Sequence, residues 1–347
     1  MNIWLFGAGL LCVGVAFFDA LWTTLWPEGG AGPLSSNVSR AAWAVAKRLT
    51  SSNGHAVHAR LSAAGPVIVV VTVLTWVILL IGGLVLIFYS EPQAVVDADI
   101  ETAANTTERI WFTLYTVSTM GNGEFKPGTG LFQVISGLAS LSAISLLSLV
   151  VTYVVQLLSA VVHKRTFAAE VFSFGNSAID ITDSLRKSRP EGVATQLAAV
   201  STLISSMRQQ HKAYPILHYF HPKYRHHSAT CAIASLDEAL TVYLEGLPED
   251  SLELVASTLQ PLRNTIGSYL EDLQGDYLVR AEQVPPTPAA EELASRGIEI
   301  ARPEALEEQT AEREQRRRLL MGLVDYNGWS WDDVLHGAGP PTGAEAS

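Results

Sequence analysis

Two long apolar stretches stand out along the chain, and a third is nearly as apolar. Residues Leu61–Ser90 and Gly128–Val162 contain no Asp, Glu, Lys or Arg, and Ile3–Trp26 contains a single acid. A helix needs about 20 apolar residues to cross the hydrocarbon of a bilayer. The pattern therefore predicts a retained N-terminal membrane helix and two further spans, at residues 66–89 and 131–162.

The polar segments between these spans differ in charge. Residues 27–64 carry four bases and one acid, whereas residues 91–108 carry five acids and no base. Because cytoplasmic loops are enriched in Lys and Arg, the first segment is expected in the cytoplasm and the second outside. The chain is therefore predicted to lie in the plasma (inner) membrane, with its N-terminus outside and its C-terminus in the cytoplasm.

Local patterns add three expectations. Asp19, inside the first span, marks either a functional position or a helix end that reaches the interface. Residues Ser39–Leu61 are partly amphipathic, with Trp43 on the apolar face, and are expected to form a helix along the inner membrane surface. In Glu304–Leu323 acids precede bases in the order that favours ion pairs along one helix.

The composition excludes several classes of protein. Of 347 residues, 48% are hydrophobic and 16% charged, against about 25% charged in an average soluble domain, and the mean hydropathy is +0.22. These values exclude an ordinary soluble enzyme, and no acid–base pair, nucleophile constellation or cofactor motif is visible. The net charge of −11 argues against nucleic acid as a partner. Cys12 and Cys231 lack the spacing of a metal or redox site.

The segment Ile110–Pro127 lies between the last two spans and cannot be another lipid-exposed span. Its aromatic first part can form a short helix, and its second part, Thr119–Glu124, reads Thr-Met-Gly-Asn-Gly-Glu. Irregular backbone at membrane depth is tolerated only where it is buried in protein or lines water. A row of backbone carbonyls can replace the water shell of a cation, and glycine permits the positive φ that aims successive carbonyls at one axis. One chain cannot encircle an ion, whereas four symmetric copies can.

These residues resemble the filter signature of potassium channels, Thr-Val-Gly-Tyr-Gly-Asp-x-x-Pro, with Pro127 at the matching position. An aromatic pore helix precedes the signature and a long apolar inner helix follows it, as in that superfamily. The resemblance covers residues 66–162 and implies a tetrameric pore-loop channel, a homotetramer in the lipid bilayer, that conducts K⁺ and needs no cofactor. It implies an ion-coordinating filter of Thr119, Met120, Gly121, Asn122 and Gly123, with Glu124 at the outer mouth.

Asn122 departs from the family, which usually has Tyr or Phe at this position. The smaller polar side chain either hydrogen-bonds to the pore helix, at Thr116 or Ser118, or leaves a wider and more hydrated filter. The second case reduces discrimination between K⁺ and Na⁺. Two alternatives therefore stay open: a weakly selective Na⁺/K⁺ channel, and a non-conducting membrane receptor or scaffold with a pore-like fold.

Residues outside the filter suggest control of conduction. The last span would be about 48 Å long, against about 30 Å of hydrocarbon, so its surplus could carry a gate. Candidate gate or cavity residues are Gly137, Ala143 and Ser145, although small residues there also serve close helix packing. The acids of residues 91–108, partly offset by Arg109 and Lys126, are expected to concentrate cations at the outer mouth.

Four histidines lie within one short aromatic stretch of the predicted cytoplasmic part, namely His218, His221, His226 and His227. They suggest sensing of protons or of anionic lipid, since histidine titrates near neutrality. The spacing is weak evidence for a metal site, so no metal is predicted beyond the permeant ions. The plain alternative is a loop packed under the membrane.

These observations together predict the domain organisation and the fold class. The predicted fold is an all-α membrane protein with an extra N-terminal transmembrane helix and a helical cytoplasmic domain. The predicted divisions are the N-terminal transmembrane helix (1–26), a cytoplasmic interfacial segment (27–65), the pore module (66–162), the cytoplasmic helical domain (163–335) and a disordered tail (336–347).

Overall fold

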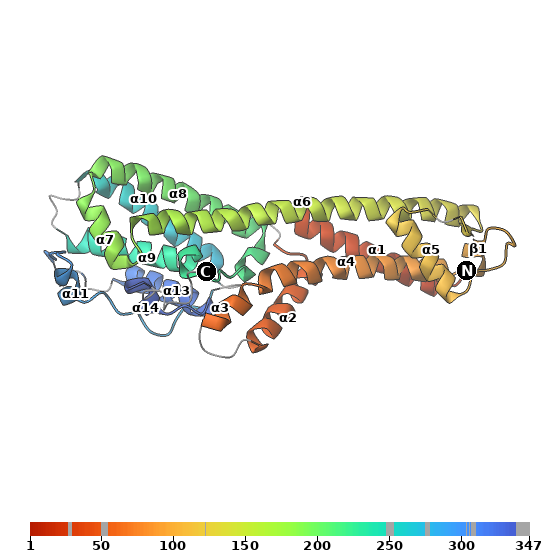
Figure 1. Cartoon of the computed structure of the whole chain (residues 1–347), viewed down its shortest axis with the longest axis horizontal. Helices are drawn as coiled ribbons and strands as arrows, with labels where there is room; N and C mark the ends of the chain where they lie inside the picture. The colour runs from red at the N-terminus through yellow and green to blue at the C-terminus, as the bar shows by residue number, and fades with distance from the viewer. Residues whose placement is uncertain are drawn as a thin grey trace, which may run out of the picture. The chain divides into compact units, whose positions relative to one another are not determined.

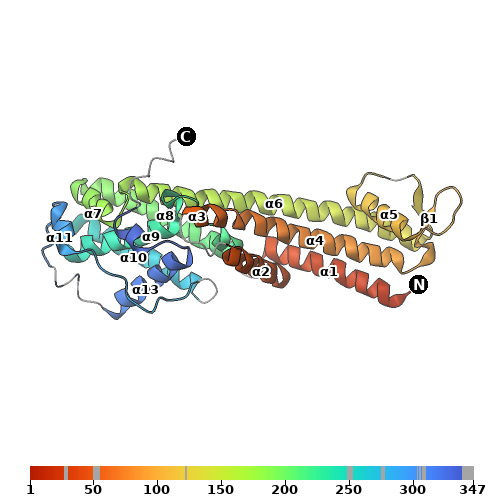
Figure 2. The same cartoon turned by 60° about the horizontal axis from the view of Figure 1, so that its bottom comes forward.

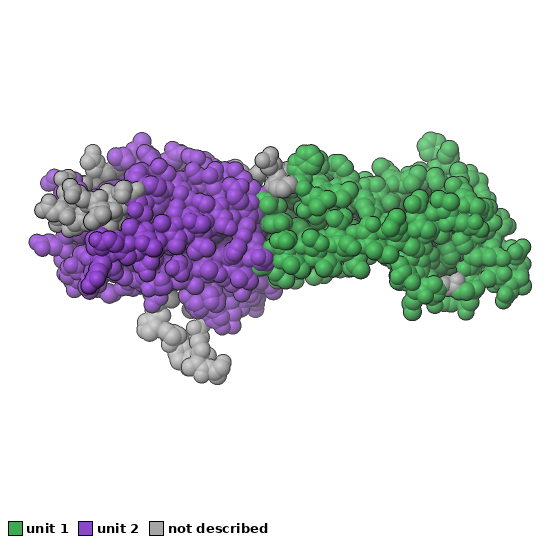
Figure 3. All heavy atoms as spheres, turned by 90° about the horizontal axis from the view of Figure 1, so that it is seen from above, with its two compact units in different colours: residues 1–49, 64–158, 213–216 green, residues 50–63, 159–212, 217–347 purple. Residues whose placement is uncertain are grey.

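The computed structural model describes residues 1–26, 30–49, 55–121, 123–247, 253–274, 278–302, 304, 306 and 310–337. The chain divides into two compact units, coloured green and purple in Figure 3. Unit 1 comprises residues 1–49, 64–158 and 213–216, and unit 2 comprises residues 50–63, 159–212 and 217–347. Almost all of the predicted tail therefore lies outside the described residues.

Within the residues that the structure describes, three helices are long and apolar enough to cross a membrane, α1, α4 and α6, and unit 1 contains α1, α4 and most of α6 (Figures 1 and 2). Its elements are α1 (Ile3–Leu25), α2 (Pro33–Leu49), α4 (Ala64–Tyr89), η1 (Pro92–Ala94), β1 (Val95–Asp97), α5 (Thr106–Ser118), β2 (Phe125–Pro127) and most of α6 (Gly130–Phe174). The three helices coincide with the predicted spans. The fold class, an all-α membrane protein, is confirmed.

The helix α6 continues well past the predicted end of its span at Val162. Apolar residues keep the helical spacing beyond the charged Lys164–Arg165 step, and Phe167, Ala168 and Val171 are buried in the core of unit 2. Packing of this continued apolar face explains why the helix extends to Phe174 instead of ending at Val162.

The helices α1 and α4 run antiparallel and touch through glycine. The amide of Asn2, at the start of α1, donates to the carbonyl of Ser90, just after α4, at 2.6 Å. A Cβ atom added at Gly9 would meet the Gly83 carbonyl oxygen at 2.5 Å, and one added at Gly83 would meet the Gly9 carbonyl oxygen at 2.7 Å. Small residues of this kind let the backbones of membrane helices approach closely.

Asp19 is buried within unit 1, where it holds the start of α2. Its carboxylate accepts hydrogen bonds from the amides of Leu34 (2.8 Å) and Ser35 (3.1 Å), from the Ser35 hydroxyl, and from Trp76 Nε1 (2.8 Å). The first amides of a helix lack partners inside it and carry partial positive charge, so a carboxylate there stabilises the helix. Asp19 therefore joins α1, α2 and α4 through its carboxylate.

The predicted interfacial helix differs from the observed one in its start and its buried face. The helix α2 begins at Pro33 rather than Ser39, because Asp19 caps it there, and residues 50–54 lie outside the described part. A further short helix, α3 (His55–Leu61), follows. The buried face of α2 contains Trp43 with Ser35 and Ser39, whereas Leu49, predicted on the apolar face, is exposed.

Unit 2 is a helical domain built around α9. Its elements after α6 are α7 (Ala178–Lys187), α8 (Pro190–Ala213), η2 (Pro215–Tyr219), η3 (Arg225–His227), α9 (Ala229–Thr241), the π-helical turn η4 (Val242–Gly246), α10 (Glu253–Leu273), α11 (Ala290–Ser295), α13 (Ala311–Tyr326) and α14 (Trp331–Leu335). Every residue of α9 is buried, and α7, α10, α13 and α14 pack against it. Trp331, the first residue of α14, is buried in this core.

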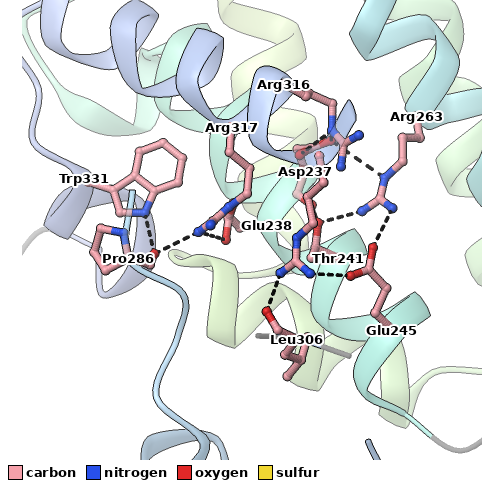
Figure 4. Close-up of polar contacts among 11 residues, drawn as sticks. Asp237, Glu238, Thr241, Glu245, Arg263, Pro286, Leu306, Arg316, Arg317 and Trp331 are labelled. Carbon is pink, nitrogen blue, oxygen red and sulfur yellow. Dashed lines mark hydrogen bonds and ion pairs between the residues drawn. The ribbon is translucent and has the colours of Figure 1, made fainter. Parts of the chain in front are cut away.

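The arginines of α13 pair with acids of another segment rather than mainly along their own helix (Figure 4). Arg316 Nε lies 3.0 Å from Asp237, Arg317 Nε lies 2.6 Å from Glu238, and Arg313 Nη1 lies 2.7 Å from Glu245. Of the basic residues here, Arg318 makes the expected pair along the helix, with Glu314 at 2.7 Å. The expectation failed because Asp237 and Glu238 are fully buried and need a charged partner.

Candidate ion pathway

The short helix α5 is fixed at its start by a capping box and one buried arginine. Asn105 accepts from the Glu108 amide, and the Glu108 carboxylate accepts from the Asn105 amide. Arg109 is 6% exposed. Its guanidinium donates to four carbonyls at 2.7 to 2.8 Å, those of Ala104, Phe88, Glu91 and Pro92. Arg109 thus ties α5 to the end of α4, a role beyond the charge offset predicted for it.

The residues after α5 begin the predicted filter. Thr119 has φ of +57° and its amide donates to the Thr116 carbonyl at 3.3 Å, while the Met120 amide donates to the Tyr115 carbonyl at 3.3 Å. Gly121 has φ of +74°. Left-handed backbone thus occurs at two alternate positions, one of them a threonine, for which this conformation is unfavourable. Alternation of this kind turns successive carbonyls toward the same side of the strand.

The predicted filter residues lie on the surface of the single chain. Thr119, Met120, Gly121, Gly123 and Glu124 are all exposed, and the Met120 side chain is 76% exposed. Asn122 is outside the described residues, so its predicted hydrogen bond to Thr116 or Ser118 is not part of the description. The described residues of the predicted filter are therefore not covered by the rest of the chain.

The acidic segment, residues 91–108, is joined to the residues after the predicted filter by a two-stranded sheet. The strands β1 and β2 are antiparallel and pair Val96 with Lys126. The Ala98 amide donates to the Glu124 carbonyl at 2.8 Å, and Lys126 Nζ lies 2.9 Å from Glu101. Backbone amides of Ile100 and Asp99 lower the pKa of Asp97, and a hydrogen bond from Lys126 lowers the pKa of Glu101. Both carboxyl groups are therefore ionised at neutral pH.

The predicted gate residues lie on a helix without a break. The helix α6 is continuous through Gly137, Ala143 and Ser145. Gly137 and Ser145 are exposed, and an added Cβ at Gly137 would meet nothing within 4 Å, so this glycine permits no close packing within the chain. Ala143 packs against the apolar cluster of unit 1. The exposed face of α6 carries an apolar stripe of Leu131, Val134, Leu138, Leu141, Ile144, Leu147, Val151, Val155, Leu158 and Val162.

The four predicted histidines fall into different environments within unit 2. His218 and His221 are buried, His227 is half-buried and His226 is exposed. His218 packs against Tyr326 with ring centroids 4.7 Å apart. In the described part of the chain, no group of three or more His, Cys, Asp or Glu side chains is placed to hold a metal ion.

His221 has a partner that the sequence did not suggest. Its Nε2 lies 2.7 Å from Nδ1 of His58, and the indole of Trp329 stacks on His58 with ring centroids 4.0 Å apart. Burial, with smaller effects from His58 and Lys164, lowers the pKa of His221 from 6.5 to about 3. His58 lies 163 residues from His221, in a segment without a motif, so no local signal could have paired them.

Comparison with known proteins gives two matches. A family described as "Ion channel" matches residues 67–160, which include nearly all of α4, the whole of α5 and the predicted filter. The chain is also 32% identical over 326 residues to the uncharacterized membrane protein YdjJ of Bacillus subtilis (strain 168), over 93% of this chain and 94% of that protein. No solved structure matches the chain.

Proposed function

Because the chain belongs to the ion channel family as an integral membrane protein related to YdjJ, we propose that four copies form a channel that conducts K⁺. The observation that carries the proposal is the backbone after α5, where Thr119 and Gly121 have left-handed φ and are both exposed. Carbonyls aimed at one axis coordinate a dehydrated cation. The channel is a passive conductor and uses no cofactor.

The exposed surface of the chain supports the tetramer. The filter residues and the apolar stripe of α6 are both left uncovered within one chain. Contiguous apolar surface on this scale is covered by lipid or by other copies. We place the inner helices α6 around the axis and α1 and α4 towards the lipid, with the N-terminus and the acidic segment outside and unit 2 in the cytoplasm.

The direct test is current through planar bilayers that contain the purified full-length protein, with K⁺ on one side and Na⁺ on the other. Reversal near the K⁺ equilibrium potential is expected. Reversal near zero would replace the proposal by weak Na⁺/K⁺ selectivity, the outcome that Asn122 favours if its smaller side chain widens the filter. Absence of current at every pH and ligand condition would favour a receptor or scaffold.

Two glycine variants locate the pathway within the chain. In Gly121→Ala the new side chain meets a φ of +74°, which strains the strand, so we expect at least a tenfold loss of current. Gly192→Ala is the matched control, because its Cβ enters open space on α8, away from the proposed pathway. Equal currents from the two variants would exclude Gly121 from the pathway.

We further propose that acidification of the cytoplasm regulates opening through His221. The folded state holds this imidazole neutral, so the stability it contributes is complete above pH 6.5 and is lost as the pH falls from 6.5 towards 3. The groups that face it are His58 on α3, Lys164 on α6, and Asn327 and Trp329 after α13. Two residues separate α3 from α4, so release of His58 frees the chain next to a membrane helix.

The regulation is tested by current from pH 8 to 5 in the wild type and in His221→Gln. Current that changes in the wild type and stays constant in the variant is the expected result. His226→Gln is the control, because His226 is exposed. A pH response that survives in His221→Gln and disappears in the control would move the sensor to the exposed histidines.

A further inference from the structure

Most serine and threonine hydroxyls in the middle of α6 donate hydrogen bonds to carbonyls of α6 itself, but Ser140 does not. Between residues 136 and 152, all described, five of the six donate to a carbonyl of their own helix three or four residues earlier; these are Ser136, Ser142, Ser145, Ser148 and Thr152. Ser140 instead donates across to the carbonyl of Thr116, the third-last residue of α5, at 2.9 Å. Its hydroxyl is therefore engaged between two elements.

The Thr116 carbonyl also contacts Thr119, the first residue of the predicted filter. The same oxygen accepts the amide of Thr119 at 3.3 Å, and Thr119 is the threonine with φ of +57°. A β-branched residue adopts this conformation only when its surroundings impose it. One carbonyl thus connects the end of α5, the strained first residue of the filter and the inner helix.

The surroundings of this junction strengthen it. Ala139, beside Ser140 on α6, is buried in the apolar cluster of unit 1, and Val117, beside Thr116, packs against the same cluster. A hydrogen bond next to packed apolar side chains is less exposed to competition from water. The last carbonyls of a helix lack the amide partners of the helix interior, and the Ser140 hydroxyl gives the Thr116 carbonyl a second donor beside the Thr119 amide.

We propose that Ser140 is a positioning residue, which holds Thr119 in its left-handed conformation and transmits movement of α6 to the filter. This inference rests on the proposed function only in assigning Thr119 to the ion pathway. Bending of α6 at Ala143 would draw the Ser140 hydroxyl away from the Thr116 carbonyl and relax Thr119. Selectivity and opening are then linked through one hydrogen bond in each subunit.

The test compares serine deletions that are chemically identical. Ser140→Ala removes the bond to α5, whereas Ser136→Ala and Ser148→Ala each remove a bond within α6. Amide hydrogen exchange of Thr119 and Met120 in the full-length protein in nanodiscs is the first readout. We expect exchange about fivefold faster in Ser140→Ala, from the loss of one hydrogen bond, and unchanged exchange in both controls. Ser140→Thr, which keeps the hydroxyl, should restore the wild-type rate.

The second readout is the K⁺/Na⁺ permeability ratio in planar bilayers, which we expect to fall severalfold in Ser140→Ala alone. Unchanged exchange at Thr119 in Ser140→Ala overturns the inference, as does an equal change in the Ser136→Ala control. If the wild type carries no current, the proposed function fails, and the exchange data still decide whether Ser140 positions Thr119. A melting temperature equal to that of the wild type separates local loosening from general destabilisation.

Discussion

Each unit buries carboxylates, but the two units satisfy them with different donors. In unit 1, Asp19 receives neutral donors, two amides at the start of α2, a hydroxyl and an indole. In unit 2, Asp237 and Glu238 receive guanidinium groups from α13. A single negative charge therefore suffices in unit 1, because the helix start supplies partial positive charge, whereas unit 2 buries both signs.

The largest effect is expected where an opposite charge is removed. Arg317→Met leaves Glu238 buried without its cation and should lower the free energy of unfolding of unit 2 by about 3–5 kcal/mol. Denaturant unfolding of the full-length protein in nanodiscs, followed by pulse proteolysis, measures this. Arg318→Met is the control on the same helix, since its pair with Glu314 is partly open to solvent, and should change stability by less than about 1 kcal/mol.

A smaller effect for each group left unpaired is expected in unit 1, where the donors left behind are neutral. Asp19→Leu removes the acceptor for the Leu34 and Ser35 amides and for Trp76 Nε1, at a cost of about 1–3 kcal/mol per buried group left unpaired. Hydrogen exchange of the α2 amides should accelerate at least tenfold. Asp19→Asn keeps one oxygen and should lie between the wild type and Asp19→Leu. If it matches Asp19→Leu, the charge rather than the acceptor holds α2.

The smallest effect is expected at a helix start whose capping side chain is uncharged. Thr310 caps α13, and its hydroxyl accepts the Arg313 amide at 3.3 Å. Thr310→Ala should lower the stability of unit 2 by about 1 kcal/mol, measured by the same unfolding experiment. A loss as large as that of Arg317→Met would mean that the start of α13, and not its ion pairs, determines how α13 is held.

The sequence predicted the features of this molecule that leave a local signature. Apolar runs predicted α1, α4 and α6, and the Gly-x-Gly pattern after an aromatic segment predicted irregular backbone, which the structure has at Thr119 and Gly121. Apolar runs and glycine patterns are local signals, because the membrane and the backbone conformation each constrain residues that are neighbours in the sequence.

Contacts between distant segments were not predictable in the same way. Arg109 gave a net-charge argument, yet its function is to hold four carbonyls around the start of α5. The α13 arginines suggested pairs along one helix, yet most of them neutralise α9 and η4. An arginine can pair with several acids that the sequence offers, and burial of those acids decides which pair forms. The contact of His58 with His221 was missed for the same reason, because the fold and not a local pattern brings the two together.

The small sheet next to the predicted filter separates the backbone geometry of this region from its surface charge. Without the sheet, a change in one would also change the other. The pairing of β1 with β2 and the bridge of Val96 with Ala103 hold the base of the turn that follows β1, and Asp97 closes that turn by accepting the amides of Asp99 and Ile100. The residues at the tip, such as Asp99, are outside the ladder. Mutation there can retune the local cation concentration over evolutionary time while the geometry of the strand behind it is conserved.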